Sequence, residues 1–107
     1  MVANYPMEKL RPTYDLDAIK SAFASIETLA ITTSALSDAI SLGYDRNGIV
    51  AVIASVKRPM FQKSMTSYAD HRVWQDVYHV PADGLLLYVK FQADVITEFR
   101  VMSFKEV

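Results

Sequence analysis

The chain has 107 residues, a formal net charge of −1, 51% hydrophobic residues and no cysteine. This length fits one domain with a modest core, expected to span residues 1–107, and the composition argues against disorder. Without cysteine there is no disulfide framework and no thiolate site. With no apolar run of about 18 residues and no signal-peptide pattern at the N-terminus, we expect a cytoplasmic protein that does not enter a membrane.

The first half of the chain carries helical patterning. Pro6 and Pro12 disfavour an early helix, so residues 1–14 are expected to be an extended lead-in. Apolar residues then recur at helical spacing and predict helices at about 16–28, 34–42 and 46–57.

Capping residues support these helices. Asp15 and Asp45 are the expected N-caps of the first and third helices, and either Thr33 or Ser34 that of the second, with Gly43 closing it. Residues 30–32 favour an edge strand or bridge. The third segment is rich in β-branched residues, so a strand over 49–56 is its alternative.

The second half alternates with a period of two, which predicts strands over 85–92 and 99–105 joined by a hairpin near 94–97. Leu87, Val89 and Phe91 are expected on the buried face, as are Met102 and Phe104; Val101 is expected on the other. In an antiparallel pair opposed residues share a face. If Tyr88 lies opposite Ser103, the polar face holds Tyr88, Lys90, Ser103 and Lys105.

Residues 61–81 hold the only Trp, both His and a Lys beside hydroxyl side chains. This stretch has neither helical nor strand periodicity, although 74–80 could add a third strand. We interpret it as an irregular surface for contact or chemistry.

Recognisable metal and phosphate motifs are missing. His71 and His79 lie eight residues apart, which is not a metal-ligand spacing, and no Gly-rich phosphate loop or Gly-x-Ser-x-Gly motif occurs. No metal or other cofactor is therefore expected.

The remaining Lys, Tyr, Gln and His residues suit RNA cleavage through the 2′-hydroxyl, which needs a base, an acid and cations. Lys63, Lys90 and Lys105 could supply charge, and Tyr88, His71 or a lysine could transfer protons. Unpaired bases could stack on Tyr68, Trp74 and Tyr78. The same residues also fit a structural role, with Trp74 and Tyr78 in the core and the lysines solvated.

Several motifs together resemble one family. They are Lys63-Ser64-Met65-Thr66, Tyr68, Asp70-His71, Trp74-Gln75-Asp76-Val77-Tyr78, Tyr88-x-Lys90 and Ser103-Phe104-Lys105-Glu106. These residues resemble the motility quorum-sensing regulator (MqsR) toxins, and the likeness runs from Met7 to the end of the chain.

The resemblance implies an α+β fold like that of RelE-like ribonucleases, with N-terminal helices packed on a C-terminal antiparallel sheet. It implies a metal-independent, sequence-specific mRNA endoribonuclease, the toxin of a type II toxin–antitoxin pair; the best-known specificity in the family is GCU. The family's catalytic positions fall on Lys63, Gln75, Tyr88 and Lys105. For RNA binding we add Tyr68, His71, Trp74 and Lys90.

The implied partners are mRNA and a zinc-containing, DNA-binding antitoxin of the MqsA kind. Departures from the family pattern are a longer hairpin before Lys105, Gln62 in place of an aromatic residue, His79 in place of a basic one, and the acidic net charge. The alternative is a family member that has lost cleavage and acts as a protein-binding co-regulator of its antitoxin.

Overall fold

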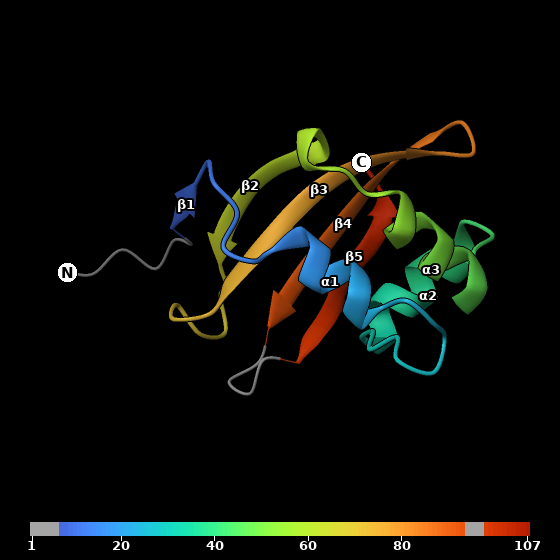
Figure 1. Ribbon diagram of the computed structural model, residues 1–107, viewed down its shortest axis with the longest axis horizontal. Coiled ribbons are helices and arrows are strands. Elements are labelled where there is room, and N and C mark those ends of the chain that lie inside the picture. The colour runs from blue at the N-terminus through green and yellow to red at the C-terminus, as the bar shows by residue number, and fades with distance from the viewer. Residues whose placement is uncertain (1–6, 94–97) are drawn as a thin grey trace.

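The structure is a computed structural model that describes residues 7–93 and 98–107. Its elements follow in the order β1 (Glu8–Lys9), α1 (Leu16–Ala22), α2 (Thr33–Ser41), α3 (Arg46–Ser55), the 3-10 helix η1 (Arg58–Met60), β2 (Phe61–Thr66), β3 (Trp74–Ala82), β4 (Leu85–Ala93) and β5 (Phe99–Glu106). The strands form one five-stranded antiparallel sheet in the order β1-β2-β3-β4-β5 (Figure 1). The predicted α+β class is confirmed.

The helices begin at side-chain caps. Asp15 and Asp45 accept hydrogen bonds from backbone N–H groups in the first turns of α1 and α3, as predicted. For α2 the cap is Thr32, so the predicted caps Thr33 and Ser34 lie one and two residues too late.

The helix α1 is shorter than the predicted 16–28. It ends at Ala22, and Phe23 is buried in the core. The following residues form turns in which Thr28 donates its backbone N–H and its hydroxyl to the Ser25 carbonyl. Such local bonds give the backbone an alternative to the helix, which explains the early end.

The segment after Gly43 is helical, so the alternative of a strand over 49–56 is wrong. The helix α3 ends at Ser55, two residues before the predicted end at 57. Gly43 has a φ of +93°, as predicted for the left-handed residue that closes α2. The prediction of a bridge at 30–32 is also confirmed, because Ile31 pairs in parallel with Val101.

Residues 61–81 are not irregular: they contain β2 and most of β3, which confirms only the predicted strand at 74–80. The strand β2 was not predicted because it contains a β-bulge, which breaks the alternation of its side chains. Its pairing with β3 shifts between Phe61 and Lys63. Phe61 consequently packs edge-on against buried Tyr78, with ring centroids 5.6 Å apart, whereas Lys63 faces the other side of the sheet.

The pairing of β4 with β5 differs from the prediction by two residues. Tyr88 lies opposite Lys105, and Ser103 lies opposite Lys90. A shift of two preserves the faces, so the predicted polar face of these four residues is confirmed. The predicted hairpin residues 94–97 lie outside the described residues.

A second bulge makes the prediction for Val101 wrong. The register shifts after the pair of Lys90 and Ser103, so that Phe91 pairs with Val101 and Met102 is the extra residue. Val101 therefore joins Phe104 in the core, where both are fully buried.

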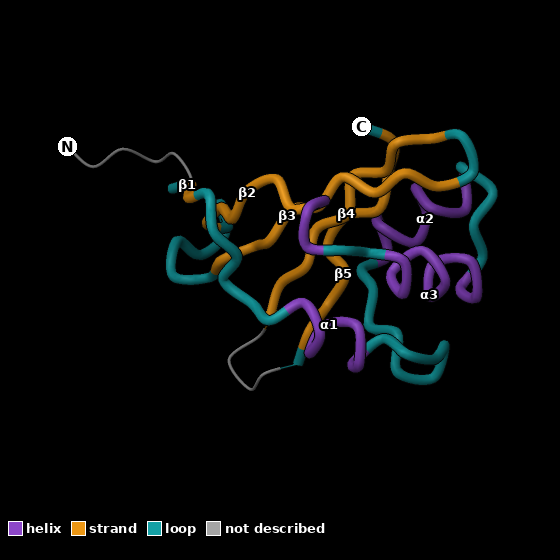
Figure 2. The backbone as a smooth tube through the Cα atoms, turned by 45° about the horizontal axis from the view of Figure 1, so that its top comes forward, coloured by secondary structure: helices purple, strands orange, loops and turns teal. Residues whose placement is uncertain are grey.

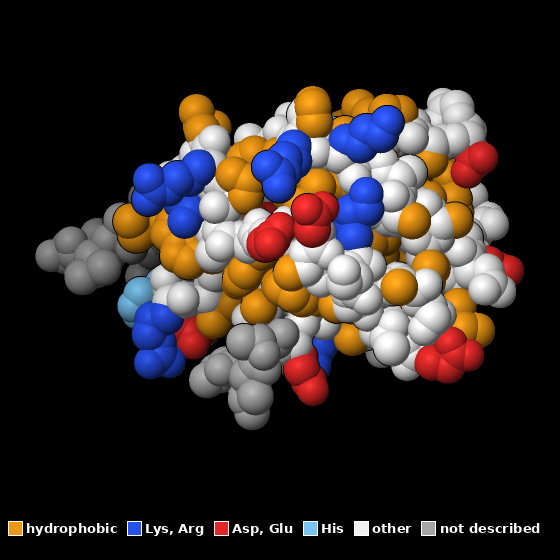
Figure 3. All heavy atoms as spheres, in the orientation of Figure 1, with side chains coloured by type: hydrophobic (Ala, Val, Ile, Leu, Met, Phe, Trp, Pro, Cys, Tyr) orange, Lys and Arg blue, Asp and Glu red, His pale blue; other side chains and the backbone are white. Residues whose placement is uncertain are grey.

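The main core lies between the helices and one face of the sheet. Its largest fully buried side chains are Tyr78, Phe23, Phe91, Phe104, Ile19, Ile49, Ile53 and Leu87. The helices gather on this side of the sheet (Figure 2). On the surface of this side, acidic and basic side chains lie among hydrophobic ones (Figure 3). No described helix has the length and apolar character needed to cross a membrane.

Candidate functional site on the open face of the sheet

The sheet face opposite the helices carries most of the predicted site. Side chains alternate between the two faces of a strand, so the register determines which residues share this face. We call it the open face and define it by Lys63, Met65, Gln75, Val77, His79, Tyr88, Lys90, Gln92, Arg100, Ser103 and Lys105.

The register arranges these side chains in three rows that run across the strands. The first row is Lys63, Val77, Lys90 and Ser103; the second is His79, Tyr88 and Lys105; the third is Met65, Gln75, Gln92 and Arg100. Successive residues on one face of a strand are about 7 Å apart. Side chains from β2, β3, β4 and β5 thereby meet within two neighbouring rows.

Tyr88 lies between an imidazole and an ammonium group. Its ring centroid is 5.9 Å from that of His79, and the Lys105 Nζ atom lies 5.4 Å from the Tyr88 centroid. Burial raises the pKa of the Tyr88 phenol, and the positive charge of Lys63 opposes this rise. At neutral pH the phenol is therefore protonated and can donate a hydrogen bond or a proton.

Lys63 is tied to the first strand. Its Nζ donates a 2.8 Å hydrogen bond to Oε2 of Glu8. Glu8 reaches this position because β1 pairs with β2, with Glu8 opposite Met65. The hydrogen bond with Glu8 raises the pKa of Lys63, so the amine stays charged.

Lys63, Lys90 and Lys105 form a cationic cluster on the open face, with Lys90 in the middle. Burial lowers the pKa of Lys90, and the charges of Lys105 and Lys63 lower it further. The electrostatic influence of these amines on one another agrees with the register. The cluster is a local concentration of positive charge on a chain whose net charge is −1.

Gln75 lies on the same face but farther along β3. It is only 6% exposed, and its Nε2 donates a 2.8 Å hydrogen bond to Oε1 of Gln92, the residue opposite it on β4. Four positions along β3 separate Gln75 from His79, which is about 13 Å. Gln75 thus lies at one end of a strip, with Tyr88 and Lys105 toward the other end.

The loop 67–73 holds two of the predicted RNA-binding residues. Tyr68 is 80% exposed, and it is the smallest of the influences that raise the pKa of Lys63. His71 is exposed and lies between Asp70 and Arg72, which form an ion pair of 3.0 Å. The structure does not bring His71 into the three rows.

Trp74 is on the other side of the sheet. It alternates with Gln75 along β3, and the Lys9 Nζ lies 4.3 Å from the centroid of its ring. Its carbonyl accepts a 2.6 Å hydrogen bond from the Tyr14 hydroxyl. Trp74 therefore helps to hold the lead-in and is not part of the open face.

Sequence reasoning did not assign His79, Glu8 or Gln92 to the site. His79 could have been assigned from the sequence, because Gln75, Val77 and His79 occupy every second position of β3 and so share one face. Glu8 and Gln92 join the site only through pairing between strands, which local spacing does not reveal.

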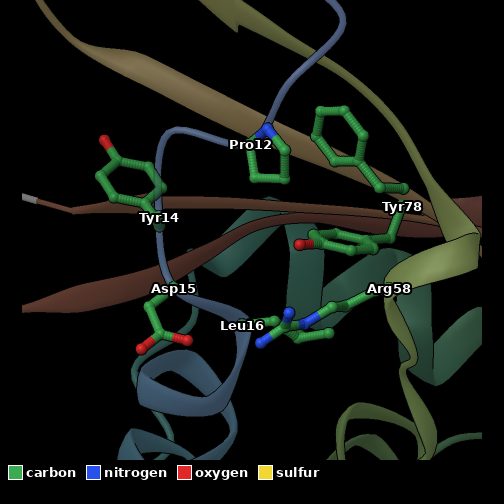
Figure 4. Close-up of a pocket in the computed structure, with 7 residues that line it drawn as sticks. Pro12, Tyr14, Asp15, Leu16, Arg58 and Tyr78 are labelled. Atoms are coloured by element: carbon green, nitrogen blue, oxygen red, sulfur yellow. The ribbon is translucent and has the colours of Figure 1, made fainter.

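A separate hollow lies between the lead-in, α1 and η1 (Figure 4). Its volume is about 330 Å³, and it is lined by Pro12, Tyr14, Asp15, Leu16, Arg58, Phe61 and Tyr78. The Tyr78 hydroxyl points into this hollow, although only 1% of the residue is exposed. The hollow is distinct from the open face, because Tyr78 alternates with Val77 and His79 along β3.

The open face has the chemistry of a site for a polyanion. Several ammonium groups can contact phosphate oxygens, and a phenol can donate a proton. Side-chain amides can form hydrogen bonds with a base or a phosphate. The fold and this face define a small α+β protein with a cationic sheet surface that also carries a phenol and an imidazole.

Comparison with known proteins places this chain in a family. Residues 11–106 match the family model described as "Motility quorum-sensing regulator, toxin of MqsA". The chain is also 38% identical over 100 residues to the mRNA interferase toxin MqsR of Escherichia coli (strain K12), covering 94% of this chain and 99% of that protein. The chain belongs to the MqsR toxin family.

Proposed function

We propose that this protein is an mRNA endoribonuclease, the toxin of a bacterial type II toxin–antitoxin pair, and that it cleaves RNA on the open face. It inhibits translation by destroying mRNA, in the cytoplasm. The observation that carries the proposal is the meeting of Lys63, Tyr88, Lys90 and Lys105 in two adjacent rows. The relationship to an mRNA interferase toxin supports the same activity.

In the proposed mechanism the ammonium groups of Lys63 and Lys105 contact the scissile phosphate and stabilise the charge that develops on it. Tyr88 takes part in proton transfer, since its raised pKa keeps the proton on the phenol until the reaction needs it. The Gln75 amide hydrogen-bonds a phosphate or base farther along the strand of RNA. No metal ion takes part in these steps.

RNA binding extends beyond the reacting phosphate. Lys90 adds charge in the middle of the cluster, and exposed Tyr68 offers a ring on which an unpaired base can stack. The positions of His71 and Trp74 give no support to the same role for them.

The protein partner is the antitoxin, as the family description indicates. We propose that this partner is a zinc-containing, DNA-binding protein of the MqsA kind. The alternative of a cleavage-deficient co-regulator drew on the mild acidity of the whole chain. That acidity does not extend to the cluster on the open face, and no observation now favours this alternative.

The test is cleavage of a defined mRNA by purified protein in excess EDTA. Wild-type protein is expected to cut, whereas Lys63→Ala and Tyr88→Phe should each lower the rate by roughly 100-fold or more. Lys57→Ala is the matched control, because it removes an exposed lysine just before η1 and outside the sheet. Equal rates for all four proteins would remove the open face from the reaction.

A further inference from the structure

His79 gives the open face an imidazole beside the phenol of Tyr88. It is opposite Tyr88 in the register of β3 and β4, is half-buried, and its ring plane is tilted by 48° from that of Tyr88. The chain has two histidines, and the other, His71, is exposed in the loop 67–73. The imidazole in the site is thus held on a rigid strand in the same row as Tyr88 and Lys105.

The proposed reaction needs a base at neutral pH. The charged and titratable side chains that share the face of His79 are Glu8 on β1, Lys63 on β2, Tyr88 and Lys90 on β4, and Arg100 and Lys105 on β5. An arginine keeps its proton in a protein. Tyr88 and Lys63 have raised pKa values, so both hold their protons and serve as acids or cations. The Glu8 carboxylate already accepts a hydrogen bond from Lys63.

Three groups remain that could accept a proton: Lys90, Lys105 and His79. Burial and its cationic neighbours lower the pKa of Lys90. The ordinary pKa of a lysine is about 10.4, however, and it must fall by several units before the amine can act as a base at neutral pH. An imidazole ordinarily titrates between pH 5 and 8, a range in which it can accept a proton. The chemistry therefore favours His79 over either lysine.

We propose that His79 is the general base of RNA cleavage, a role that rests on the proposed function. The imidazole takes the proton of the 2′-hydroxyl as the 2′-oxygen forms a bond to phosphorus. The bond from phosphorus to the 5′-oxygen breaks, and that oxygen takes the phenolic proton of Tyr88. The products are a 2′,3′-cyclic phosphate and a 5′-hydroxyl.

The protein then recovers its starting state without another reactant. The imidazolium of His79 returns its proton to the phenolate of Tyr88, directly or through water, across rings whose centroids are 5.9 Å apart. The 2′- and 5′-oxygens flank the phosphorus in an in-line reaction, so base and acid must reach it from different sides. Two separate rings in one row can do this if the phosphate lies over the gap between them.

The test measures single-turnover cleavage at saturating RNA from pH 5 to 9. The wild-type rate should rise with pH and then level within the range in which an imidazole ordinarily titrates, pH 5 to 8. His79→Gln should lower the plateau by about 100- to 10,000-fold and abolish this inflection. His71→Gln, which removes the other imidazole, should keep the inflection.

Two further measurements separate proton transfer from positioning. His79→Gln should bind a substrate with a 2′-deoxy group at the cut site as tightly as wild type does. Added imidazole should restore cleavage to His79→Ala in proportion to its basic form. His79→Asn serves in place of a glutamine variant that fails to fold, as judged by circular dichroism.

The proposal is overturned if His79→Gln keeps both the rate and the inflection. It is also overturned if the defect is confined to RNA affinity, or if Lys90→Met loses the inflection while His79→Gln retains it. These results leave cleavage by the open face intact. If wild-type protein makes no cut at any pH, the proposed function itself fails.

Discussion

The ammonium of Lys63 and the carboxylate of Glu8 lie 2.8 Å apart, although 55 positions separate them in the chain. This ion pair places a negative charge in the cationic cluster. A phosphate that binds Lys63 must share or displace the carboxylate. Glu8 therefore limits how strongly the free protein holds RNA.

Glu8→Gln is expected to tighten RNA binding by roughly fivefold, which is about 1 kcal/mol for two unit charges near 4 Å in water. The free energy of unfolding should fall by less than about 1 kcal/mol, since the pair is partly exposed. Binding is measured with an uncleavable 2′-deoxy substrate at fixed salt. Glu27→Gln, an exposed carboxylate between α1 and α2, is the control. An equal gain in the control would assign the effect to net charge alone.

The salt dependence of RNA binding should report the lysines on the open face. Each phosphate contact adds about 0.7 to the slope of log affinity against log salt for a single strand. Lys105→Gln and Lys90→Gln should each reduce that slope by about this amount. Titrations between low and moderate salt measure it, with Lys57→Gln as control. A slope unchanged by either substitution would show that these lysines make no phosphate contact.

The grouping of Tyr88, Lys90, Ser103 and Lys105 on one face could be predicted because strand alternation is a local property. It survived a register error of two residues, since such a shift does not exchange faces. The caps at Asp15 and Asp45 were predictable for a similar reason: each carboxylate acts on the next turn of its own helix.

The strand β2 could not be predicted because its bulge breaks the alternation. Phe61 packs against Tyr78 on the helix side, while Lys63, two residues later, faces the opposite side. The same effect at Met102 reversed the prediction for Val101. Bulges are set by contacts with neighbouring strands, so local periodicity does not reveal them. The roles of the individual site residues stay predictions.

The buried carboxylate of Asp76 ties the lead-in to the sheet. It is fully buried and accepts hydrogen bonds of 2.9–3.0 Å from the backbone N–H groups of Thr13 and Tyr14. Asp76→Asn replaces an accepting oxygen with a donating NH₂ that faces these N–H groups. The free energy of unfolding should fall by about 1–3 kcal/mol in urea titrations. Asp38→Asn, on the exposed side of α2, should change it little. A similar loss in both variants would contradict the role of Asp76.

The buried phenol of Tyr78 should make stability depend on alkaline pH. Burial is the main cause that raises the pKa of Tyr78 to about 12, against a value near 10 in the unfolded chain. A raised folded-state pKa contributes stability that is complete below pH 10 and is lost as the pH rises from 10 to 12. Burial also raises the pKa of Tyr44 to about 12. The free energy of unfolding should therefore fall between pH 10 and pH 12 in both the wild-type protein and a Tyr78 variant.

Tyr78→Phe removes one of these two contributions and keeps the aromatic ring in the core. Relative to wild type, the variant should gain about 1 kcal/mol of unfolding free energy between pH 9 and pH 11. Urea titrations at both pH values measure this change, which is independent of any constant difference between the two proteins. Tyr68→Phe is the control, because folding leaves that side chain 80% exposed. If the difference between Tyr78→Phe and wild type stays the same at both pH values, the Tyr78 phenol ionises as readily in the folded protein as in the unfolded chain.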